Sequence, residues 1–369
     1  MVLKKNKPLS IFMDRHDVSD IVTAENVAQL HQEDLKIQHK YGCNGLTYWF
    51  DDKRKTAFCL VEAPTAQAVI NMHNKAHGEV PHRIIEVDAN LVESFLGRIE
   101  DPEKSKNTKL NIINDPAFRT LMVMEIKKFL LTKEEVLQNI NKLFNKIFGN
   151  FNGTVVKKNE DYFLVSFQSV SKALLCALEI QSQFKIITKD FDNNNFHLKI
   201  GLNSGVPVTK KTTLFEDTIK LAERMCNISN ADIVVSSEVK DLYKSENMNI
   251  FIDGKQVFAL TTADEKFLNN LMDYTEEKWR NTDLKVDDFC KHLGYSKSQL
   301  YRKMISLIDK SPNTFLKEFR LNKALKLLNK RTSNISEIAY ETGFNSLSYF
   351  SKCFQKRYNL LPSNYLNVN

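Results

Sequence analysis

The sequence predicts a multidomain chain in which two α+β domains precede an all-α domain. Its 369 residues are enough for two or three domains of ordinary size. Strand-like and helix-like patterns follow the order β-α-β-β-α-β over residues 1–100, and the same order with additions returns over residues 118–262. From residue 263 onward the periodicity is helical only, and it includes two pairs of short helices joined by a turn that contains glycine.

The first domain, residues 1–100, is expected to form a ferredoxin-like sheet, because β-α-β-β-α-β is the element order of that fold. Strands are predicted at Leu9–Arg15, Leu46–Phe50, Thr56–Glu62 and Arg83–Val87, and helices at Ala24–Tyr41 and Thr65–Ala76. Both helices of this fold lie on one face of the sheet, so polar stripes on the two helices can converge.

Histidine is concentrated in this domain. Six of the eight histidines lie within the first 82 residues: His16, His31, His39, His73, His77 and His82. His73 and His77 are four residues apart and share one helical face. On the other helix, His31 forms a polar stripe with Asp34 and Gln38. Imidazole with carboxylate suits a borderline divalent metal, so the pattern predicts a metal site, although a surface or hydrogen-bonded role is the alternative for any single histidine.

Several strings of this segment are similar to a known family. They are M-D-R-H, A-x-x-H-x-x-D-L-x-x-Q-x-K-Y-G, Y-W-F-D, F-C-L-V-E-A-P and V-I-N-M-H-N-K-A-H-G. They resemble a small bacterial family related to nickel-binding dimeric α+β barrels. The resemblance implies a metal-sensing domain with six candidate ligands: His16, His31, Asp34, Glu62, His73 and His77. Copper or zinc would suit such ligands as well as nickel.

Residues 101–117 begin with the polar run D-P-E-K-S-K-N-T-K and are predicted to be a linker. The second α+β domain is expected over residues 118–262. Its strands are predicted at Leu121–Ile126, Val155–Lys158, Tyr162–Phe167, His197–Leu202 and Ile233–Ser236, and its helices at Lys133–Phe148, Val170–Phe184 and Glu216–Ile228. This order indicates a second ferredoxin-like sheet with added elements.

The middle segment resembles class III nucleotidyl cyclases in V-V-K-K-N-E-D-Y-F-L-V-S-F, A-L-L-C-A-L-E-I-Q, L-K-I-G-L-N-S-G and I-K-L-A-E-R-M. The resemblance implies a nucleotide site whose two metal-binding acids, base-reading lysine and phosphate-stabilising arginine are Glu125, Asp161, Lys157 and Arg224. Four hallmark positions have changed, at Glu125, Glu160, Thr213 and Lys220. Together these changes predict a domain that is not an enzyme, and either nucleotide binding without catalysis or a dimerisation scaffold is expected instead.

The excess of positive over negative charge lies entirely in the last part of the chain. From Glu265 to the end there are 18 Lys and Arg against 11 Asp and Glu, an excess that equals the net charge of +7 of the whole chain. This balance is what a phosphate-binding module requires, although a solvated basic face would give the same count.

The two helix-turn-helix motifs have their turns at Gly294 and Gly343, and Ser296 and Ser346 can cap the second helix of each. Strings such as S-K-S-Q-L-Y-R-K, I-S-E-I-A and G-F-N-S-L-S-Y-F resemble the DNA-binding domain of the AraC/XylS family. The resemblance covers residues 263–369 and implies a seven-helix double helix-turn-helix domain that binds double-stranded DNA. Asn359 stands where the family usually has glycine, and asparagine tolerates the left-handed backbone conformation.

Roles follow from aligning the two motifs. Base-facing side chains are expected at Ser298, Tyr301, Arg302, Leu347, Ser348, Ser351 and Lys352. Phosphate contacts are expected at Lys297, Lys303, Lys356 and Arg357. Core positions are expected at Tyr349, Phe350 and Phe354. The long helix between the motifs is expected to pack on both through Phe315, Phe319, Ala324, Leu327 and Leu328.

The sequence therefore predicts a transcription regulator of AraC type, controlled by a metal ion at its N-terminal domain, by a nucleotide at the middle domain, or by both. We expect a cytoplasmic homodimer with free cysteines and no membrane segment, and RNA polymerase is a further candidate partner. One alternative is an active nucleotidyl cyclase with a DNA-binding tail. The other is a first domain that oligomerises without any ligand.

Overall fold

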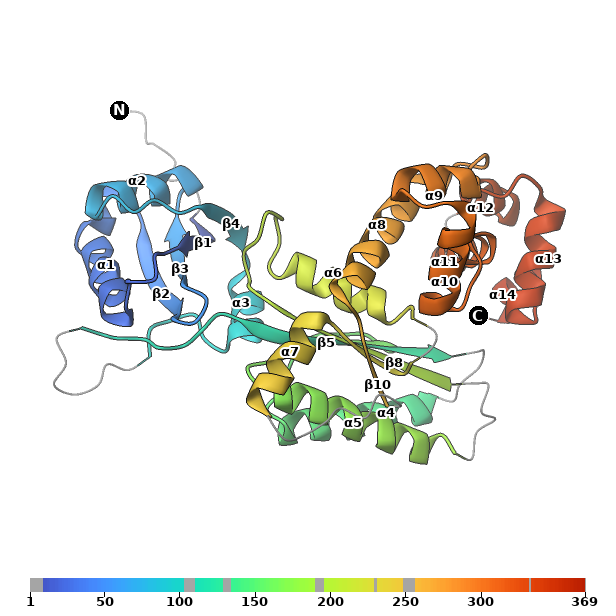
Figure 1. Ribbon diagram of the computed structural model, residues 1–369, viewed down its shortest axis with the longest axis horizontal. Helices are drawn as coiled ribbons and strands as arrows, with labels where there is room; N and C mark the ends of the chain where they lie inside the picture. The colour runs from blue at the N-terminus through green and yellow to red at the C-terminus, as the bar shows by residue number, and fades with distance from the viewer. Residues whose placement is uncertain are drawn as a thin grey trace.

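The computed structural model describes residues 9–102, 110–128, 134–189, 196–228, 231–247, 256–331 and 333–368. Two β-sheets and a group of helices follow one another along the longest axis of the molecule (Figure 1). Within the described part of the chain, no helix is both long enough and apolar enough to cross a membrane.

The N-terminal sheet consists of four antiparallel strands in the order β2-β3-β1-β4. The strands are β1 (Ser10–Asp17), β2 (Asn44–Asp51), β3 (Thr56–Ala63) and β4 (Arg83–Val87). Helices α1 (Ala24–Ile37) and α2 (Ala66–Ala76) pack on one face of the sheet. Thr23 and Thr65 cap the two helices with their hydroxyl groups, and the 3-10 turn η1 (Gln38–Tyr41) extends α1. The first and third strands of the β-α-β-β-α-β order therefore lie side by side in the middle of the sheet.

Both faces of this sheet are covered. Along β1 and β3, Phe12 and Val61 face the helices, whereas Met13 and Leu60 face the middle domain. The second face contacts helix α3 (Ala89–Leu96), which was not predicted from the sequence. Asp88 caps α3, and Gly97 ends it in the left-handed conformation.

The expected linker also contributes contacts. Of residues 101–117, positions 101–102 and 110–117 are described. The hydroxyl group of Tyr48 accepts a hydrogen bond from the backbone of Ile113 at 2.9 Å, and the backbone N–H of Phe50 donates to the carbonyl of Asp115 at 3.1 Å. This segment therefore packs along strand β2 and joins the two sheets.

The middle sheet has six strands in the order β10-β9-β8-β5-β7-β6. They are β5 (Arg119–Lys128), β6 (Thr154–Lys158), β7 (Tyr162–Phe167), β8 (Phe196–Gly205), β9 (Ile233–Val235) and β10 (Val257–Ala259). The four strands from β5 to β8 are antiparallel neighbours and repeat the arrangement of the N-terminal sheet. Strands β9 and β10 extend the sheet in parallel fashion, and β10 was not predicted.

Helices cover the middle sheet on both sides (Figure 1). Helices α4 (Glu134–Asn150), α5 (Val170–Ile187) and α7 (Ser237–Glu246) share one core with the sheet, and α7 was also not predicted. Helix α6 (Glu216–Met225) lies on the other face. It approaches β8 so closely that a side chain at Gly201 would collide with the carbonyl oxygen of Ala222.

In its described residues, the C-terminal region consists of seven helices. They are α8 (Thr262–Lys278), α9 (Val286–Leu293), α10 (Lys297–Ile308), α11 (Pro312–Lys330), α12 (Ile335–Glu341), α13 (Leu347–Tyr358) and α14 (Pro362–Val368). Gly294 and Gly343 adopt positive φ angles in the two turns, and Asn359 adopts φ 57° at the end of α13.

Helix α11 holds the two helix-turn-helix motifs together. Phe315 and Phe319 pack in the first hydrophobic core, and Ala324, Leu327 and Leu328 pack in the second. The sequence-based prediction for this helix is confirmed.

Candidate metal centre and nucleic-acid interface

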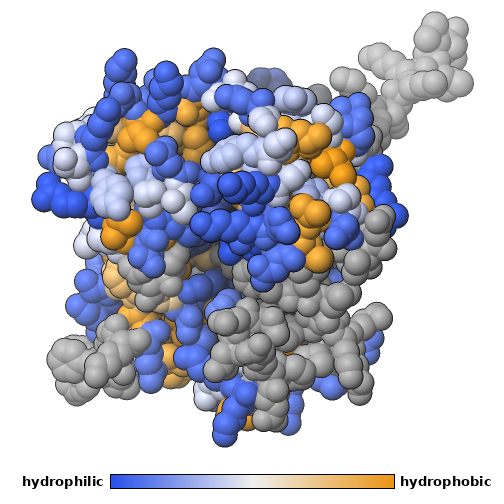
Figure 2. All heavy atoms as spheres, turned by 90° about the vertical axis from the view of Figure 1, so that its right-hand side faces the viewer, coloured by the Kyte–Doolittle hydropathy of each residue, from blue (hydrophilic) through white to orange (hydrophobic). Residues whose placement is uncertain are grey.

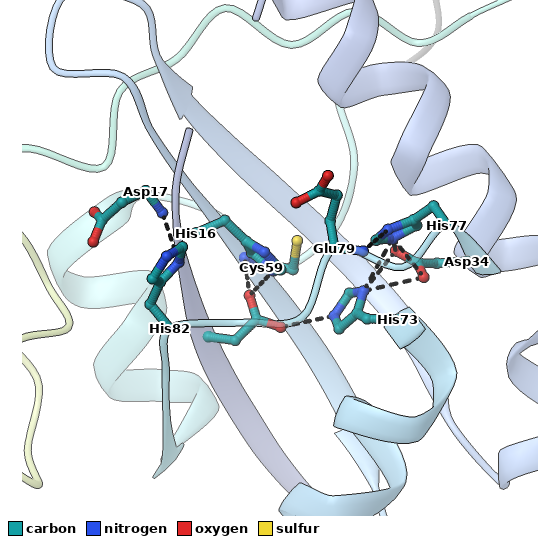
Figure 3. Close-up of polar contacts among 9 residues, drawn as sticks. His16, Asp17, Asp34, Cys59, His73, His77, Glu79 and His82 are labelled. Atoms are coloured by element: carbon teal, nitrogen blue, oxygen red, sulfur yellow. Dashed lines mark hydrogen bonds and ion pairs between the residues drawn. The ribbon is translucent and has the colours of Figure 1, made fainter. Parts of the chain in front are cut away.

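A buried set of imidazole, carboxylate and thiol groups lies between the N-terminal sheet and its two helices (Figure 3). Strand alternation turns Asp14 and His16 of β1 and Cys59 of β3 toward the helices. His73 projects from the last turn of α2 toward these strands. The chain thereby concentrates polar groups in an otherwise apolar layer.

The inner group consists of Asp14, His16, Cys59 and His73, whose candidate ligand atoms all lie within 4.8 Å of one another. The Nε2 atom of His73 lies 2.9 Å from Oδ2 of Asp14. The other oxygen, Oδ1, accepts the backbone N–H of Cys59 at 3.0 Å and lies 3.3 Å from Nε2 of His16. All four residues are buried.

The outer group consists of Asp34, His73 and His77. Nδ1 of His73 lies 3.0 Å from Oδ2 of Asp34, and Nε2 of His77 lies 3.2 Å from Oδ1 of the same carboxylate. The backbone N–H of Glu79 donates to Nδ1 of His77 at 3.1 Å. His73 belongs to both groups, and one ring nitrogen faces each.

The ionisable groups of the inner and outer groups shift one another's pKa values. Burial alone would lower the pKa of His73, but hydrogen bonds and charge from Asp14 and Asp34 raise it to about 10. Burial alone would raise the pKa of Asp14, but the nearby charges of His16 and His73 and the hydrogen bond with His73 hold it well below its usual range. The pKa of Asp34 is also lowered, because His73 and His77 outweigh the effect of its burial. Burial and the nearby carboxylates of Asp14 and Asp34 raise the pKa of the Cys59 thiol well above its usual value.

The inner group fits a divalent transition metal. Among the described residues, Nε2 of His16 is buried and makes no hydrogen bond, although it lies 3.3 Å from Oδ1 of Asp14. Two imidazoles, one carboxylate and one thiol are also the donor set that nickel, copper and zinc accept. An unsatisfied buried nitrogen within such a donor set indicates a place for an ion.

Four of the six sequence-predicted ligands lie in these two groups: His16, Asp34, His73 and His77. The other two lie elsewhere. Nε2 of His31 is 3.6 Å from Oδ2 of Asp101, and its ring packs on Tyr48. Glu62 is partly exposed on β3 and accepts a hydrogen bond from Asn44 at 3.5 Å.

Asp14 and Cys59 were not selected from the sequence. Both occur inside strings already noted, M-D-R-H and F-C-L-V-E-A-P. The two-residue alternation of a strand could have identified Asp14, because Asp14 must share a face with His16.

The second helix of each helix-turn-helix motif presents the predicted base-facing side chains. On α10, Ser298, Tyr301 and Arg302 are exposed, and the Nε atom of Arg302 donates to the carbonyl of Ser298 at 3.4 Å. On α13, Leu347, Ser348 and Lys352 are exposed and Ser351 is half-buried. Hydrophilic side chains cover most of the described surface on this side of the molecule (Figure 2).

The side chains predicted to contact phosphate differ in how exposed they are and in whether they already have an ion-pair partner. Lys356 is exposed on α13, and Arg357 is partly buried. Lys297 forms an ion pair with Asp287 at 2.7 Å on the surface. Lys303 is bound to Asp264, an N-terminal residue of α8, so it ties α10 to α8 instead of projecting freely.

One core prediction for α13 is wrong. Phe350 and Phe354 are buried as expected, but Tyr349 is 55% exposed. Tyr349 follows Ser348 at the start of the helix and therefore lies beside the predicted base-facing residues. Its ring packs on the edge of the core through Phe344, with the ring centroids 6.1 Å apart.

The four residues predicted to bind a nucleotide lie in different surroundings. Glu125 lies on β5 opposite Tyr162, whose hydroxyl donates to Glu223 at 2.9 Å. Asp161 is exposed in the turn before β7, and Lys157 is exposed on β6. Arg224 is buried, and its guanidinium faces α8 instead of open solvent.

Comparisons with known proteins match the two ends of the chain. Residues 12–87 match the family described as nickel responsive protein SCO4226-like, and residues 289–367 match a helix-turn-helix domain family. The crystal structure of SCO4226 from Streptomyces coelicolor A3(2) is 33% identical over 21% of this chain and 95% of that chain, with a TM-score of 0.20.

Two curated relatives share shorter stretches. The histidine kinase P4 of Formosa agariphila is 39% identical over 109 residues, which are 30% of this chain and 8% of that protein. The uncharacterized HTH-type transcriptional regulator YdeC of Bacillus subtilis is 34% identical over 84 residues, which are 23% of this chain and 29% of that protein. The chain thus spans less than a third of either relative.

Proposed function

Because this chain carries a SCO4226-like nickel-responsive domain at residues 12–87 and an AraC-type helix-turn-helix domain at residues 289–367, we propose that it is a metal-controlled transcription regulator. It binds double-stranded DNA through α10 and α13. A divalent transition metal in the N-terminal domain changes that DNA binding. Nickel is the first candidate, and copper or zinc would suit the same donors.

The metal half of the proposal rests on the inner group. Asp14, His16, Cys59 and His73 would hold the ion, and the observation that carries the proposal is the buried, unpartnered Nε2 atom of His16. The bound ion would supply a compact positive charge that fixes β1, β3 and α2 relative to one another.

The DNA half rests on the exposed faces of α10 and α13. Each helix follows a tight turn and presents Ser, Tyr, Arg or Lys side chains that can contact base edges or phosphates. Since α11 packs on both motifs, the two helices are held at a fixed spacing. We expect them to enter successive major grooves on one face of the duplex.

A contact path connects the two halves. Arg15 lies between Asp14 and His16 on β1 and donates to the carbonyl of Val208 at 3.2 Å, in the loop before α6. Arg83 on the neighbouring strand β4 donates to the carbonyl of Lys210 at 2.7 Å in the same loop. A change in the position of β1 is thereby transmitted to the start of α6.

Helix α6 continues the path. Its residue Ala222 packs in the core shared with the N-terminal sheet, while Leu221 and Met225 pack in the core shared with α8. Lys303 then links α8 to the base-facing helix α10 through Asp264. Packed elements with defined contacts of this kind can carry energetic coupling between two sites.

Selection of bound duplexes from a random pool tests the proposal. The full chain is expected to enrich a motif with two boxes about one helical turn apart, and bound fractions should fall as salt is raised. Enrichment should differ between Ni²⁺-loaded and chelator-treated protein. Equal retention of all sequences in both states would contradict the proposal.

A further inference from the structure

The inner and outer groups share His73, so the layer could hold one ion or two. The ring of His73 separates them. Its Nδ1 faces Asp34 and His77 (Figure 3), and its Nε2 faces Asp14. The hydrogen bonds within each group indicate whether it binds an ion itself or orients the ligands of the other group.

The outer group is complete without an ion. The backbone N–H of Glu79 donates to Nδ1 of His77, so this nitrogen carries no proton and the ring's proton lies on Nε2. That Nε2–H donates to Asp34, and the Nδ1–H of His73 donates to the same carboxylate. Every polar atom that the two imidazoles direct into the outer group therefore has a partner.

The positive charge of an ion in the outer group would also be poorly compensated. The ion would displace both of these N–H protons, and of the carboxylates in the described part of the chain Asp34 alone belongs to this group. The side chains of Asp34 and His77 are only 6% and 4% exposed, so water cannot substitute for a missing charge.

In the inner group, by contrast, one buried polar atom lacks a hydrogen bond. Nε2 of His16 has no hydrogen-bond partner among the described residues, and Asp14 is fully buried. An ion there would gain the His16 nitrogen, which makes no hydrogen bond, together with the Asp14 carboxylate and the Cys59 sulfur, and it would replace the proton on Nε2 of His73.

We propose that the inner group binds a single ion through Nε2 of His73, and that Asp34 and His77 are positioning residues that orient this imidazole through its Nδ1–H. A carboxylate that accepts the second N–H of a metal-bound histidine fixes the ring and strengthens its ligand nitrogen. His77 in turn fixes Asp34, since its Nε2–H occupies the other carboxylate oxygen. This inference rests on the proposed metal binding.

Metal titration of the full-length protein tests it, with calorimetry for affinity, elemental analysis for stoichiometry and Co²⁺ as a spectroscopic probe. The wild-type chain should bind one ion, with a thiolate-to-Co²⁺ charge-transfer band from Cys59. Asp34→Asn should weaken Ni²⁺ binding about 10- to 100-fold while keeping one ion and the same band. Asp34→Glu should recover part of the affinity.

Matched variants distinguish residues that bind the ion from residues that only orient a ligand. Cys59→Ser should abolish the charge-transfer band, whereas His31→Gln, in the same α1 layer but outside both groups, should leave affinity and spectrum unchanged. His77→Gln gives a second variant at the end of α2, in case Asp34→Asn fails to fold, and circular dichroism checks the fold of each. It should also weaken binding without changing stoichiometry.

Two results would overturn the inference. One is two ions per wild-type chain with one remaining in Asp34→Asn, which would make the outer group a site of its own. The other is unchanged Ni²⁺ affinity in folded Asp34→Asn and His77→Gln. A wild-type chain that binds no ion at all would instead overturn the proposed function.

Discussion

Arg224 of helix α6 donates a hydrogen bond to the side-chain oxygen of Asn269 of helix α8 at 2.6 Å. The same guanidinium contacts Asp273 and lies 3.8 Å from Glu276, also on α8. The residue that the sequence suggested for binding a nucleotide phosphate is therefore engaged between the middle domain and the first helix of the DNA-binding region. This contact has consequences for stability, for coupling and for catalysis.

Replacing Arg224 with Ala should loosen α6 from α8. We expect a loss of about 1–2 kcal/mol of unfolding free energy, because a buried side chain and its polar contacts disappear. We also expect Ni²⁺ to change DNA affinity less than in the wild type. Urea denaturation and DNA binding with and without Ni²⁺ measure the two effects. Arg280→Ala is the matched control, since Arg280 is exposed and pairs with Glu341; equal behaviour of both variants would count against the α6–α8 path.

The middle domain should not form cyclic nucleotides. Arg224 faces α8, and Glu125 stands where the predicted resemblance to cyclases would place a shorter aspartate. Incubation of the full chain with Mn²⁺ and either ATP or GTP, followed by chromatography, should show no cyclic product. A measurable rate of cyclic nucleotide formation that disappears in Asp161→Asn would contradict this prediction and would favour the alternative that the middle domain is an active nucleotidyl cyclase.

Arg302 and Lys356 should affect DNA binding in different ways. Arg302→Ala should lose roughly 1–3 kcal/mol at one base pair and relax specificity there, because arginine can bind guanine with two hydrogen bonds. Lys356→Ala should weaken all sequences alike and reduce the salt dependence by about one phosphate contact. Mobility shifts on a series of point-mutated duplexes distinguish them. A uniform loss for Arg302→Ala would show that its contact is to phosphate.

The link between Asp264 and Lys303 should make α8–α10 packing sensitive to acid. Burial would raise the pKa of Asp264, but hydrogen bonds and charge from Lys303 and Thr261 lower it below the ordinary 3.8. A carboxylate with a lowered folded-state pKa stabilises the protein above its ordinary pKa, and this contribution disappears as the pH falls through the folded value. Asp264→Asn should therefore cost about 1 kcal/mol at pH 7 and progressively less below about pH 4.

Thermal unfolding of wild type and Asp264→Asn across this acid range, without metal, provides the measurement. The difference between the two melting temperatures should shrink toward zero on acidification. A difference that stays constant with pH would mean that the aspartate acts through packing alone.

Much of this architecture could be predicted because the relevant patterns are local. Helical spacing and capping residues gave the pairs of helices around Gly294 and Gly343, and the alternation of Leu9–Arg15 gave the first strand. His73, His77 and Asp34 could be expected to be neighbours, because two helices on one sheet face can bring their polar stripes together, and in the structure they do.

The rest depends on contacts between distant segments. Strand β3 is buried on both faces, so its apolar run T-A-F-C-L-V does not reveal that Cys59 faces the helices. Helix α3 is short, and its buried residue Phe95 packs on Phe215, more than a hundred residues away. Tyr349 has the spacing of a core residue but lies at the exposed start of α13.

The most direct test of metal control is the DNA affinity of the full chain at one fixed salt concentration, measured by fluorescence anisotropy with saturating Ni²⁺ and with chelator. The proposed coupling predicts a ratio of dissociation constants of about 5 to 150, in either direction. The ratio should fall to one in His16→Gln and stay as in the wild type in His31→Gln. Equal affinities of the wild-type chain with and without bound Ni²⁺ would contradict the central claim.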